Sequence, residues 1–321
     1  ADYKPEDDLL TVWDSTQHPH EVREHLVHLL GRTESGIRVV APDVGGGFGE
    51  KGCLFPEEVL VPYLAIVLGR PIKWMESRQE NMTAFHGRGH SVEVEAAVKS
   101  DGTILGIKVN IVADLGAYFL LSTPQVPVLT SHRLTGPYRT PAMSVEVQGV
   151  VTNKPPTGAY RGAGGPEGAY FMERTVDLIA KDLGLDPVDV RRKNLIPNNA
   201  FPYETATGLT YDSGNYGPAL DRALELSEYS HFRQVQKERT GSEPLIGIGV
   251  ATVVKASGGG GAMMSSIARV DIEADGRVKV YTEVSPHGQG TETTFAQITA
   301  DELGVDIENV EILHGDTNDL P

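Results

Sequence analysis

The spacing of hydrophobic residues predicts alternating strands and helices in the first part of the chain. A short apolar run at Leu9–Trp13 is typical of a strand. Pro19 fits the first turn of a helix that ends near Gly31. The apolar face of this helix consists of Val22, Leu26, Leu29 and Leu30. A second strand at Ile37–Val40 and a second, more apolar helix at Glu57–Leu68 follow.

Polar and apolar residues alternate in two later regions, and each of these regions predicts a β-hairpin. The first hairpin covers residues 91–113 with a turn at 100–103, and the second covers 267–284. A helix candidate follows each hairpin, at Glu167–Leu183 in the first case and at Thr293–Leu303 in the second. The repeated pattern predicts an α+β fold made of two related, intimately packed halves.

The boundary between the two halves is predicted in the polar segment Gln234–Pro244. This boundary gives a first half at residues 1–235 and the beginning of a second half at 236–321. A chain of 321 residues with 40% hydrophobic content has enough apolar material for two packed cores.

Charge and cysteine content exclude several classes of function. The formal net charge of −16 opposes the phosphate attraction on which nucleic-acid binders rely, so we expect no nucleic-acid partner. Cys53 is the single cysteine, so the chain cannot form an internal disulfide or hold an iron–sulfur cluster by itself. The sequence has neither an apolar run of about 18 residues nor a signal-peptide pattern. We therefore expect a cytoplasmic protein without membrane insertion, and the strand-like start at Ala1 suggests a fragment of a longer chain.

Three glycine-rich runs carry the main chemical signal. They are Gly45–Lys51, Ala159–Gly165 and Pro286–Thr291. Glycine lets backbone N–H groups approach a ligand closely and adopt positive φ, so three such runs suggest one extended, oxygen-rich ligand. The first run matches neither the Gly-x-Gly-x-x-Gly dinucleotide fingerprint nor the P-loop pattern. For any one run alone, a simple turn is the default interpretation.

Together with their flanking residues, the three runs resemble the molybdenum-cofactor-binding region of the xanthine dehydrogenase and aldehyde oxidase family. This family includes the large subunits of the bacterial carbon monoxide dehydrogenase type. The resemblance extends over nearly the whole chain, in the same order. Its carriers are Ser15–Gln17, Gly45–Lys51, Ala159–Glu167, Asp186–Pro187, Arg191–Asn194, His287–Thr291 and Ala296–Gln297.

The resemblance implies the molybdopterin-binding portion of a molybdenum hydroxylase, which oxidises an aldehyde or an N-heteroaromatic substrate with water-derived oxygen. The implied cofactor is molybdenum–molybdopterin in its cytosine dinucleotide form. Its dithiolene sulfurs hold the metal, so no residue of this chain is expected to be a direct metal ligand. The resemblance also implies [2Fe–2S] clusters and FAD on partner subunits or domains, in an oligomer of heteromers.

The resemblance assigns catalytic positions to three residues. Gln17 matches the glutamine that hydrogen-bonds an oxygen ligand of molybdenum. Phe48 belongs to the loop whose backbone comes close to the metal centre, and Arg161 matches a pterin contact. An isolated arginine could equally be a surface ion-pair partner, but its position between Tyr160 and Gly162 favours the cofactor.

Further cofactor-binding positions lie in all three runs. Neutral amide and backbone N–H donors suit the oxygens and phosphates of this cofactor without adding charge. The matching positions are Gly46, Gly47, Phe48 and Gly49 in the first run, Arg161 and Gly162 in the second, and His287, Gly288, Gln289, Gly290 and Thr291 in the third. Other polar candidates are given no site role: His86, His90 and His132 lack metal-ligand spacing, and Cys53 is expected to be a small buried thiol.

Two departures from the family pattern limit the range of expected substrates. Gly52 stands where purine-oxidising members have a glutamate, and Gly162 stands where copper-containing carbon monoxide dehydrogenases have a cysteine. Neither xanthine nor carbon monoxide is therefore the expected substrate. The family's catalytic glutamate lies in a segment that this chain lacks, so the second half is incomplete and the chain alone is expected to be inactive. The alternative interpretation is a non-catalytic cofactor-binding or scaffolding fragment of such a complex.

Overall fold

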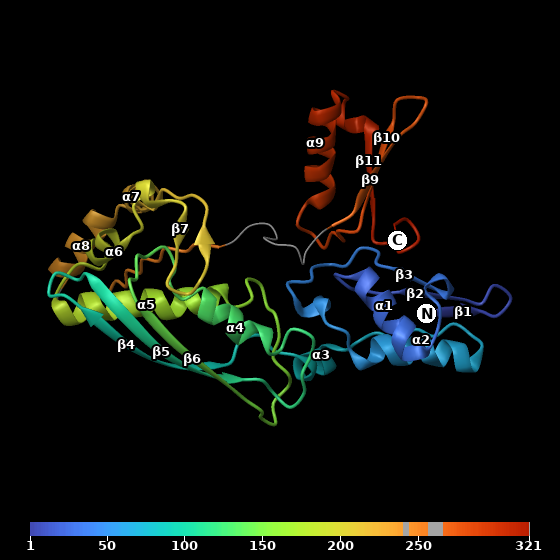
Figure 1. Ribbon diagram of the computed structural model, residues 1–321, viewed down its shortest axis with the longest axis horizontal. Coiled ribbons are helices and arrows are strands. Elements are labelled where there is room, and N and C mark those ends of the chain that lie inside the picture. Colours follow the sequence, from blue (N-terminus) through green and yellow to red (C-terminus); the bar gives the residue numbers. More distant parts are fainter. Residues whose placement is uncertain (240–243, 256–265, 321) are drawn as a thin grey trace. The chain divides into compact units, whose positions relative to one another are not determined.

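The computed structural model describes residues 1–239, 244–255 and 266–320, and these form two compact units. Unit 1 comprises residues 1–86 and 159–161 together with the described part of 257–321. Unit 2 comprises residues 87–158 and the described part of 162–256. Both units are discontinuous in sequence, because the chain leaves unit 1 after residue 86, returns to it briefly at residues 159–161, and returns again after unit 2 is complete (Figure 1). A spatial division of this kind does not test the sequence division at residue 235, which stays a prediction.

A β-β-α-β arrangement occurs three times among the described residues. In each case the first two strands are antiparallel, and the third strand pairs in parallel with the second after a helical crossover. In unit 1 the first set is β1 (Asp2–Lys4), β2 (Leu9–Trp13), α1 (Pro19–Leu30) and β3 (Ile37–Val40), and the second is β9 (Ala268–Ile272), β10 (Val278–Thr282), α9 (Thr291–Leu303) and β11 (Val310–His314). In unit 2 the set is β4 (His90–Val98), β5 (Ile104–Asp114), α4 (Gln125–His132) and β6 (Met143–Val150).

The remaining elements flank these sheets. In unit 1 they are η1 (Glu34–Gly36), η2 (Glu50–Gly52), α2 (Pro56–Leu68), α3 (Arg78–Ala84) and η4 (Ile307–Asn309). In unit 2 they are α5 (Gly165–Leu183), α6 (Pro187–Asn194), η3 (Asn198–Ala200), β7 (Tyr203–Glu204), β8 (Thr210–Tyr211), α7 (Tyr216–Leu226) and α8 (Tyr229–Glu238). No helix in the described part of the chain is long and apolar enough to cross a membrane.

The predicted α+β class and the predicted elements are confirmed, with ends that differ by one or two residues. Helices α5 and α9 each begin two residues before the predicted start, at Gly165 and Thr291. The predicted boundary segment 234–244 overlaps α8, which continues to Glu238. Residues 240–243 of that segment lie outside the described residues.

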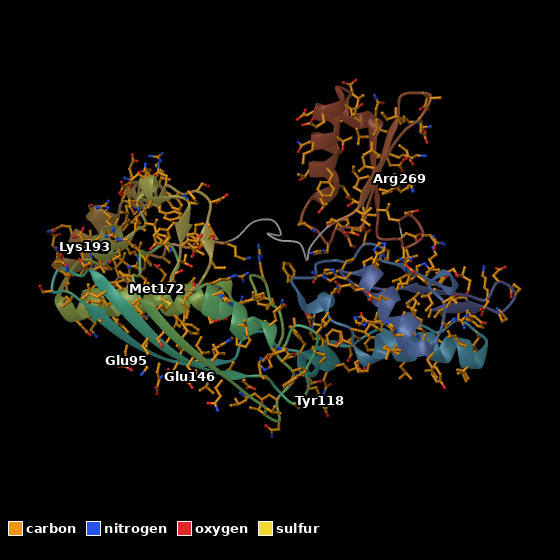
Figure 2. All side chains as sticks on the ribbon, viewed as in Figure 1. Glu95, Tyr118, Glu146, Met172, Lys193 and Arg269 are labelled. Atoms are coloured by element: carbon orange, nitrogen blue, oxygen red, sulfur yellow. The ribbon has the colours of Figure 1, made fainter. Side chains whose placement is uncertain are left out.

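The core of unit 2 lies between its three-stranded sheet and α5. Alternate residues of β5, such as Val109 and Ile111, are buried against Met172 of α5. Glu95 of β4 and Glu146 of β6 lie on the other face of the sheet, away from α5 (Figure 2). This alternation of apolar and polar faces is the pattern by which the sequence predicted the hairpin.

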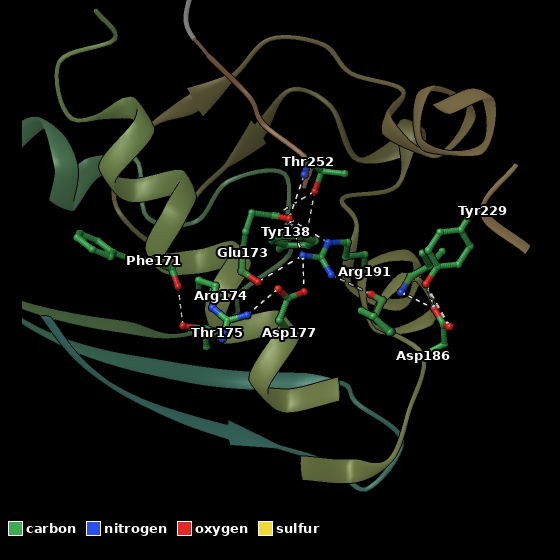
Figure 3. Close-up of polar contacts among 12 residues, drawn as sticks. Tyr138, Phe171, Glu173, Arg174, Thr175, Asp177, Asp186, Arg191, Tyr229 and Thr252 are labelled. Atoms are coloured by element: carbon green, nitrogen blue, oxygen red, sulfur yellow. Dashed lines mark hydrogen bonds and ion pairs between the residues drawn. The ribbon is translucent and has the colours of Figure 1, made fainter. Parts of the chain in front are cut away.

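A buried ionic network holds α5, α6 and the segment 244–255 together in unit 2. The guanidinium of Arg191 has no exposed surface and forms ion pairs of 2.9 Å with Glu173 and with Asp177 (Figure 3). The Glu173 carboxylate also accepts hydrogen bonds from the Tyr138 hydroxyl at 2.6 Å and from the Thr252 backbone N–H at 3.0 Å. Because a buried charge is tolerated only when it is paired, these partners fix the positions of the two helices.

A pair of carboxyl groups in unit 1 interacts directly. Asp14 follows β2, and Glu58 lies in the first turn of α2, where it also accepts a hydrogen bond from the Phe55 backbone N–H. Burial, together with the charge of Asp14, raises the pKa of Glu58 to about 9. Burial also raises the pKa of Asp14, against the opposing hydrogen bond from Glu58 and the charge of Lys51. At neutral pH the pair therefore holds a proton that an unfolded chain would release.

We predict that Glu58→Gln removes a pH dependence of stability. Because the folded-state pKa is raised, the contribution of Glu58 is fully present below its ordinary pKa of 4.5 and is lost as pH rises toward 9. A neutral amide can still accept from Phe55, so the variant should be more stable than wild type at alkaline pH, by roughly 1–2 kcal/mol. Melting temperatures of the complete subunit between about pH 5 and 9 test this, with exposed Glu93→Gln as the control. Parallel pH profiles for wild type and Glu58→Gln would contradict it.

Candidate functional site

The first glycine run packs directly on the side chain of Gln17. The Gly49 backbone N–H donates to Gln17 Oε1 at 2.8 Å. A Cβ atom at Gly47 would lie 2.4 Å from the same oxygen, so no larger residue fits there without moving the carboxamide. Gly45, Gly46 and Gly49 have positive φ angles of 73°, 93° and 98°, which glycine adopts at little cost. The run therefore has to be glycine both for its conformation and for its contact with Gln17.

This packing sets the direction of the Gln17 amide. Its carbonyl oxygen is occupied by Gly49, so the donor end of the group, Nε2, is the end left for a ligand. The Gln17 backbone N–H donates to the Lys51 carbonyl oxygen at 2.9 Å, and the hydroxyl of buried Thr16 donates to the same oxygen at 3.2 Å. Gln17 is thus a neutral hydrogen-bond donor whose main chain and side chain are both fixed by the loop.

Phe48 and Arg161 lie together beside this loop. Phe48 has φ of +57°, an uncommon value for a residue with a side chain, and the residue is 53% exposed. The Arg161 backbone N–H donates to the Phe48 carbonyl oxygen at 2.8 Å, and the guanidinium carbon lies 5.6 Å from the ring centroid. A Cβ at Gly49 would lie 2.4 Å from the Ala159 carbonyl oxygen. The start of the second run is therefore in close contact with the first.

The rest of the second run belongs to unit 2 and leads into α5. Gly162 and Gly164 have φ angles of 103° and 85°, and a Cβ at Gly164 would lie 2.5 Å from the Thr130 backbone nitrogen. The Arg133 guanidinium donates to the Gly162 carbonyl oxygen at 3.0 Å and to the Ala163 carbonyl oxygen. Arg133 was not among the predicted residues, because no motif marks an arginine that donates to the carbonyl oxygens of a distant turn.

The third run leads into α9 in unit 1, with Gly290 as the N-cap and Thr291 as the first helical residue. The Gln289 carboxamide oxygen accepts from the His287 backbone N–H at 2.7 Å, which leaves Nε2 as its donor end, as in Gln17. Both glutamines stand two residues before a helix that follows the second strand of a β-β-α-β set. Among the described residues, a Cβ at Gly288 or Gly290 would meet no atom within 4 Å. The backbone there is open to a ligand.

Two buried polar atoms belong to residues near the carboxyl ends of β10 and β11: Ser285 immediately precedes the third run, and His314 is the last residue of β11. Ser285 Oγ and His314 Nδ1 are buried, with no hydrogen-bond partner among the described residues. The other ring nitrogen of His314, Nε2, lies 2.6 Å from Glu292 in the first turn of α9. Neither Ser285 nor His314 was among the predicted residues, since no sequence pattern distinguishes them. Among the described residues, no hydrogen bond joins the third run to Gly45–Gly49.

Other polar candidates lie outside this arrangement. Cys53 is buried, as expected for a small packed thiol. Burial lowers the pKa of His90, and His132 Nδ1 lies 3.0 Å from the Thr207 carbonyl oxygen. Among the described residues, no three His, Cys, Asp or Glu side chains are grouped to hold a metal ion. A cavity of about 530 Å³ in unit 1 is lined by Trp13, Trp74 and the Asp14–Glu58 pair, but by none of the predicted site residues.

Comparison with known proteins gives matches along most of the chain. Residues 1–195 and residues 222–321 each match a molybdopterin cofactor-binding domain family. The carbon monoxide dehydrogenase large chain of Hydrogenophaga pseudoflava is 39% identical, over 100% of this chain and 42% of its own length. The nicotine 6-hydroxylase large subunit of Paenarthrobacter nicotinovorans is 34% identical, over 97% of this chain and 40% of its own length.

A solved structure has the same fold. Quinoline 2-oxidoreductase from Pseudomonas putida 86 superposes with a TM-score of 0.93 at 36% identity, over 99% of this chain and 42% of that chain. The chain thus spans about two fifths of the length of the relatives that it matches.

We predict that Gly47→Ala displaces the Gln17 carboxamide, because the added Cβ would overlap its oxygen. Overpacking of this kind costs about 1–3 kcal/mol. The Gly49 amide should lose its acceptor and exchange faster with deuterium, which hydrogen-exchange mass spectrometry of the complete subunit measures. Gly52→Ala is the matched control, since its Cβ would meet only the His18 ring at 3.4 Å. Equal protection of the loop in the two variants would contradict the prediction.

Proposed function

Because the chain belongs to the molybdopterin cofactor-binding domain family, we propose that it is the cofactor-binding part of a molybdenum hydroxylase large subunit. The proposed reaction is the oxidation of an N-heteroaromatic compound or an aldehyde with oxygen from water. The observation that carries this proposal is the convergence of Gln17, the first glycine run and Arg161, which are far apart in sequence.

The residues present fit the proposed cofactor, which is extended and rich in oxygen and phosphate. Gly288 and Gly290 leave open backbone before α9, whose N-terminal N–H groups favour anions. The buried hydroxyl of Ser285 has no partner among the described residues, so it has a hydrogen bond to offer. In Gln17 and Gln289 the carboxamide oxygen accepts a backbone N–H of the glycine run, which leaves the amide N–H groups to donate to a ligand. These groups bind oxygens without adding positive charge to an acidic protein.

The family resemblance supplies each of the following proposed contacts. Gln17 would donate from Nε2 to an oxygen atom of the cofactor, beside the backbone of Gly46, Gly47, Phe48 and Gly49. Arg161, Gly162 and Gln289 would contact the pterin. His287, Gly288, Gly290 and Thr291 would hold its polar tail, for which we propose the cytosine dinucleotide form. When bound, the molybdenum centre supplies the two-electron oxidation.

This chain's own contribution to the reaction is binding and orientation. Gln17 is held at its main chain by the Lys51 carbonyl oxygen and at its side chain by Gly49. A donor fixed in this way can stabilise charge that develops on a neighbouring oxygen without reorganising during the reaction. Phe48 places an exposed aromatic ring beside Arg161, where a planar aromatic substrate could pack.

Two glycines support the proposed substrate class. Gly52 leaves no carboxylate after Lys51 to bind a purine, and Gly162 leaves no thiol after Arg161 to bind copper. A relative that acts on nicotine and one that acts on quinoline are 34% and 36% identical to this chain. N-heteroaromatic compounds are therefore the first substrates to test, followed by aldehydes.

We further propose partner subunits that carry [2Fe–2S] clusters and FAD, in a cytoplasmic oligomer of heteromers. The single cysteine of this chain supports the placement of the clusters on other subunits or domains, since a cluster usually needs four thiolates. The test is to purify the complete enzyme with its partners and to measure molybdenum, pterin and released cytidine nucleotide, together with oxidation of quinoline, nicotine and benzaldehyde. Absence of molybdenum would refute the proposal, and bound cofactor without any oxidation would favour a scaffolding role.

We predict that Gln17→Ala in the complete enzyme lowers turnover per molybdenum atom by about 10²–10³, because a fixed donor is lost from a site where charge develops. Bound molybdenum should stay near the wild-type level. Gln17→Glu is a second variant, since it keeps the acceptor for Gly49 and replaces the N–H donor by a carboxylate oxygen, and it should also be slow. Gln148→Glu, on an exposed position of β6, is the control. Unchanged turnover per metal with lowered stability would assign Gln17 a purely structural role.

Arg161→Ala should instead reduce cofactor occupancy, because a guanidinium with fork geometry is lost from the proposed pterin contact. Molybdenum per large subunit is the measurement. Arg277→Ala is the matched control, since that side chain is exposed and pairs only locally with Glu273 and Asp275. Normal metal content and normal rate in Arg161→Ala would remove Arg161 from the site.

A further inference from the structure

Lys51 links three segments around Gln17 through its side chain and its backbone. Its ammonium group donates to Ser15 Oγ at 2.8 Å and to the Val44 carbonyl oxygen. Ser15 Oγ also donates to the Val44 carbonyl oxygen at 3.1 Å. Val44 immediately precedes the first glycine run and Ser15 stands two residues before Gln17. We propose that Lys51 is a positioning residue, which holds the Gln17 segment against the glycine run so that the Gln17 amide donor faces the cofactor.

The backbone of Lys51 acts on the same segment from its other side. The Lys51 carbonyl oxygen accepts both the Gln17 backbone N–H at 2.9 Å and the Thr16 hydroxyl at 3.2 Å. The ammonium group and the carbonyl oxygen of one residue thus hold Ser15, Thr16 and Gln17 in succession. Thr16 is only 1% exposed, so this segment has little freedom to shift while Lys51 is in place.

The positive charge of Lys51 lies close to acceptor groups of both segments. The ammonium stands near Asp14, whose pKa it lowers against the larger effect of burial. Without the ammonium, the Ser15 hydroxyl would still donate to the Val44 carbonyl oxygen, but each of these two oxygens would lose the N–H donor that it now accepts from. A cation with three N–H donors satisfies both, and a methylene chain alone cannot. Loss of the ammonium should therefore increase the mobility of the contact between Val44, which precedes the first glycine run, and Ser15, without unfolding unit 1.

The inference rests on the proposed role of Gln17, and its consequence is catalytic misalignment. A displacement of about 1 Å at a reacting group can cost on the order of 10² in rate. In the complete enzyme, Lys51→Met keeps the stem and removes the donors. We expect turnover per molybdenum atom to fall by about 10-fold to 10²-fold, while molybdenum content stays unchanged. Lys279→Met is the matched control, since that lysine is paired with Glu273 on a surface hairpin.

A double-mutant cycle with Gln17→Ala separates positioning from general structure. If Lys51 acts through Gln17, the double variant should be no slower than Gln17→Ala alone, because the group that Lys51 positions is already absent. The Mo(V) electron paramagnetic resonance spectrum after dithionite reduction gives a readout independent of turnover. It should change in the same direction in Lys51→Met and in Gln17→Ala. Should Lys51→Met fail to fold, Ser15→Ala removes one acceptor of the ammonium and should cause a smaller change of the same kind.

Several results would overturn the inference. These are a wild-type spectrum and turnover in Lys51→Met, rate losses that multiply in the double variant, or loss of bound molybdenum with normal turnover per remaining atom. If Gln17→Ala is slow and Lys51→Met is not, the inference on Lys51 fails and the proposed function stands. If the wild-type enzyme contains no molybdenum, the proposed function fails and the inference fails with it.

Discussion

The contact on which the candidate site depends is the packing of a glycine backbone against one carboxamide. Gly47 leaves no space for a Cβ beside Gln17, and Gly49 donates to the same side chain. This contact orients the Gln17 amide, and Gly49 in turn lies against the Ala159 carbonyl oxygen. The first loop, Gln17 and the residues before Arg161 are therefore held as one piece, and a change in any of them is expected to move the others.

The fold repeats one arrangement, and the proposed cofactor contacts of two of its copies lie at corresponding ends. In two β-β-α-β sets of unit 1, a glutamine precedes the crossover helix and accepts a backbone N–H with its carbonyl oxygen. In a parallel pair joined by a helix, the carboxyl ends of the strands and the helix N-terminus meet at one edge. Gln17 and Gln289 occupy that edge in their respective sets, which explains why two distant segments have the same local chemistry.

Much of the fold could be predicted from the sequence, because long amphipathic segments leave a clear period. The hairpin β4–β5 and helix α5 are examples. The first β-β-α-β set was not recognised as a repeat, because β1 has only three residues and too few positions to show alternation. The glycine runs could be found from their composition, and the role of Gln17 was predicted through the family resemblance. The sequence pattern could not predict two hydrogen bonds of the site, from the Gly49 N–H to Gln17 and from Arg133 to the Gly162 carbonyl oxygen. Both depend on backbone geometry, which the order of side chains does not reveal.

A crystal structure of the complete enzyme with its cofactor tests the central claim most directly, through the two ends of the Gln17 carboxamide. We expect Oε1 to accept from the Gly49 N–H, as it does here, and Nε2 to lie within hydrogen-bond distance of a cofactor oxygen. A structure in which the cofactor is bound but Nε2 faces only protein or solvent would contradict the assignment of Gln17 as the oriented donor of this site.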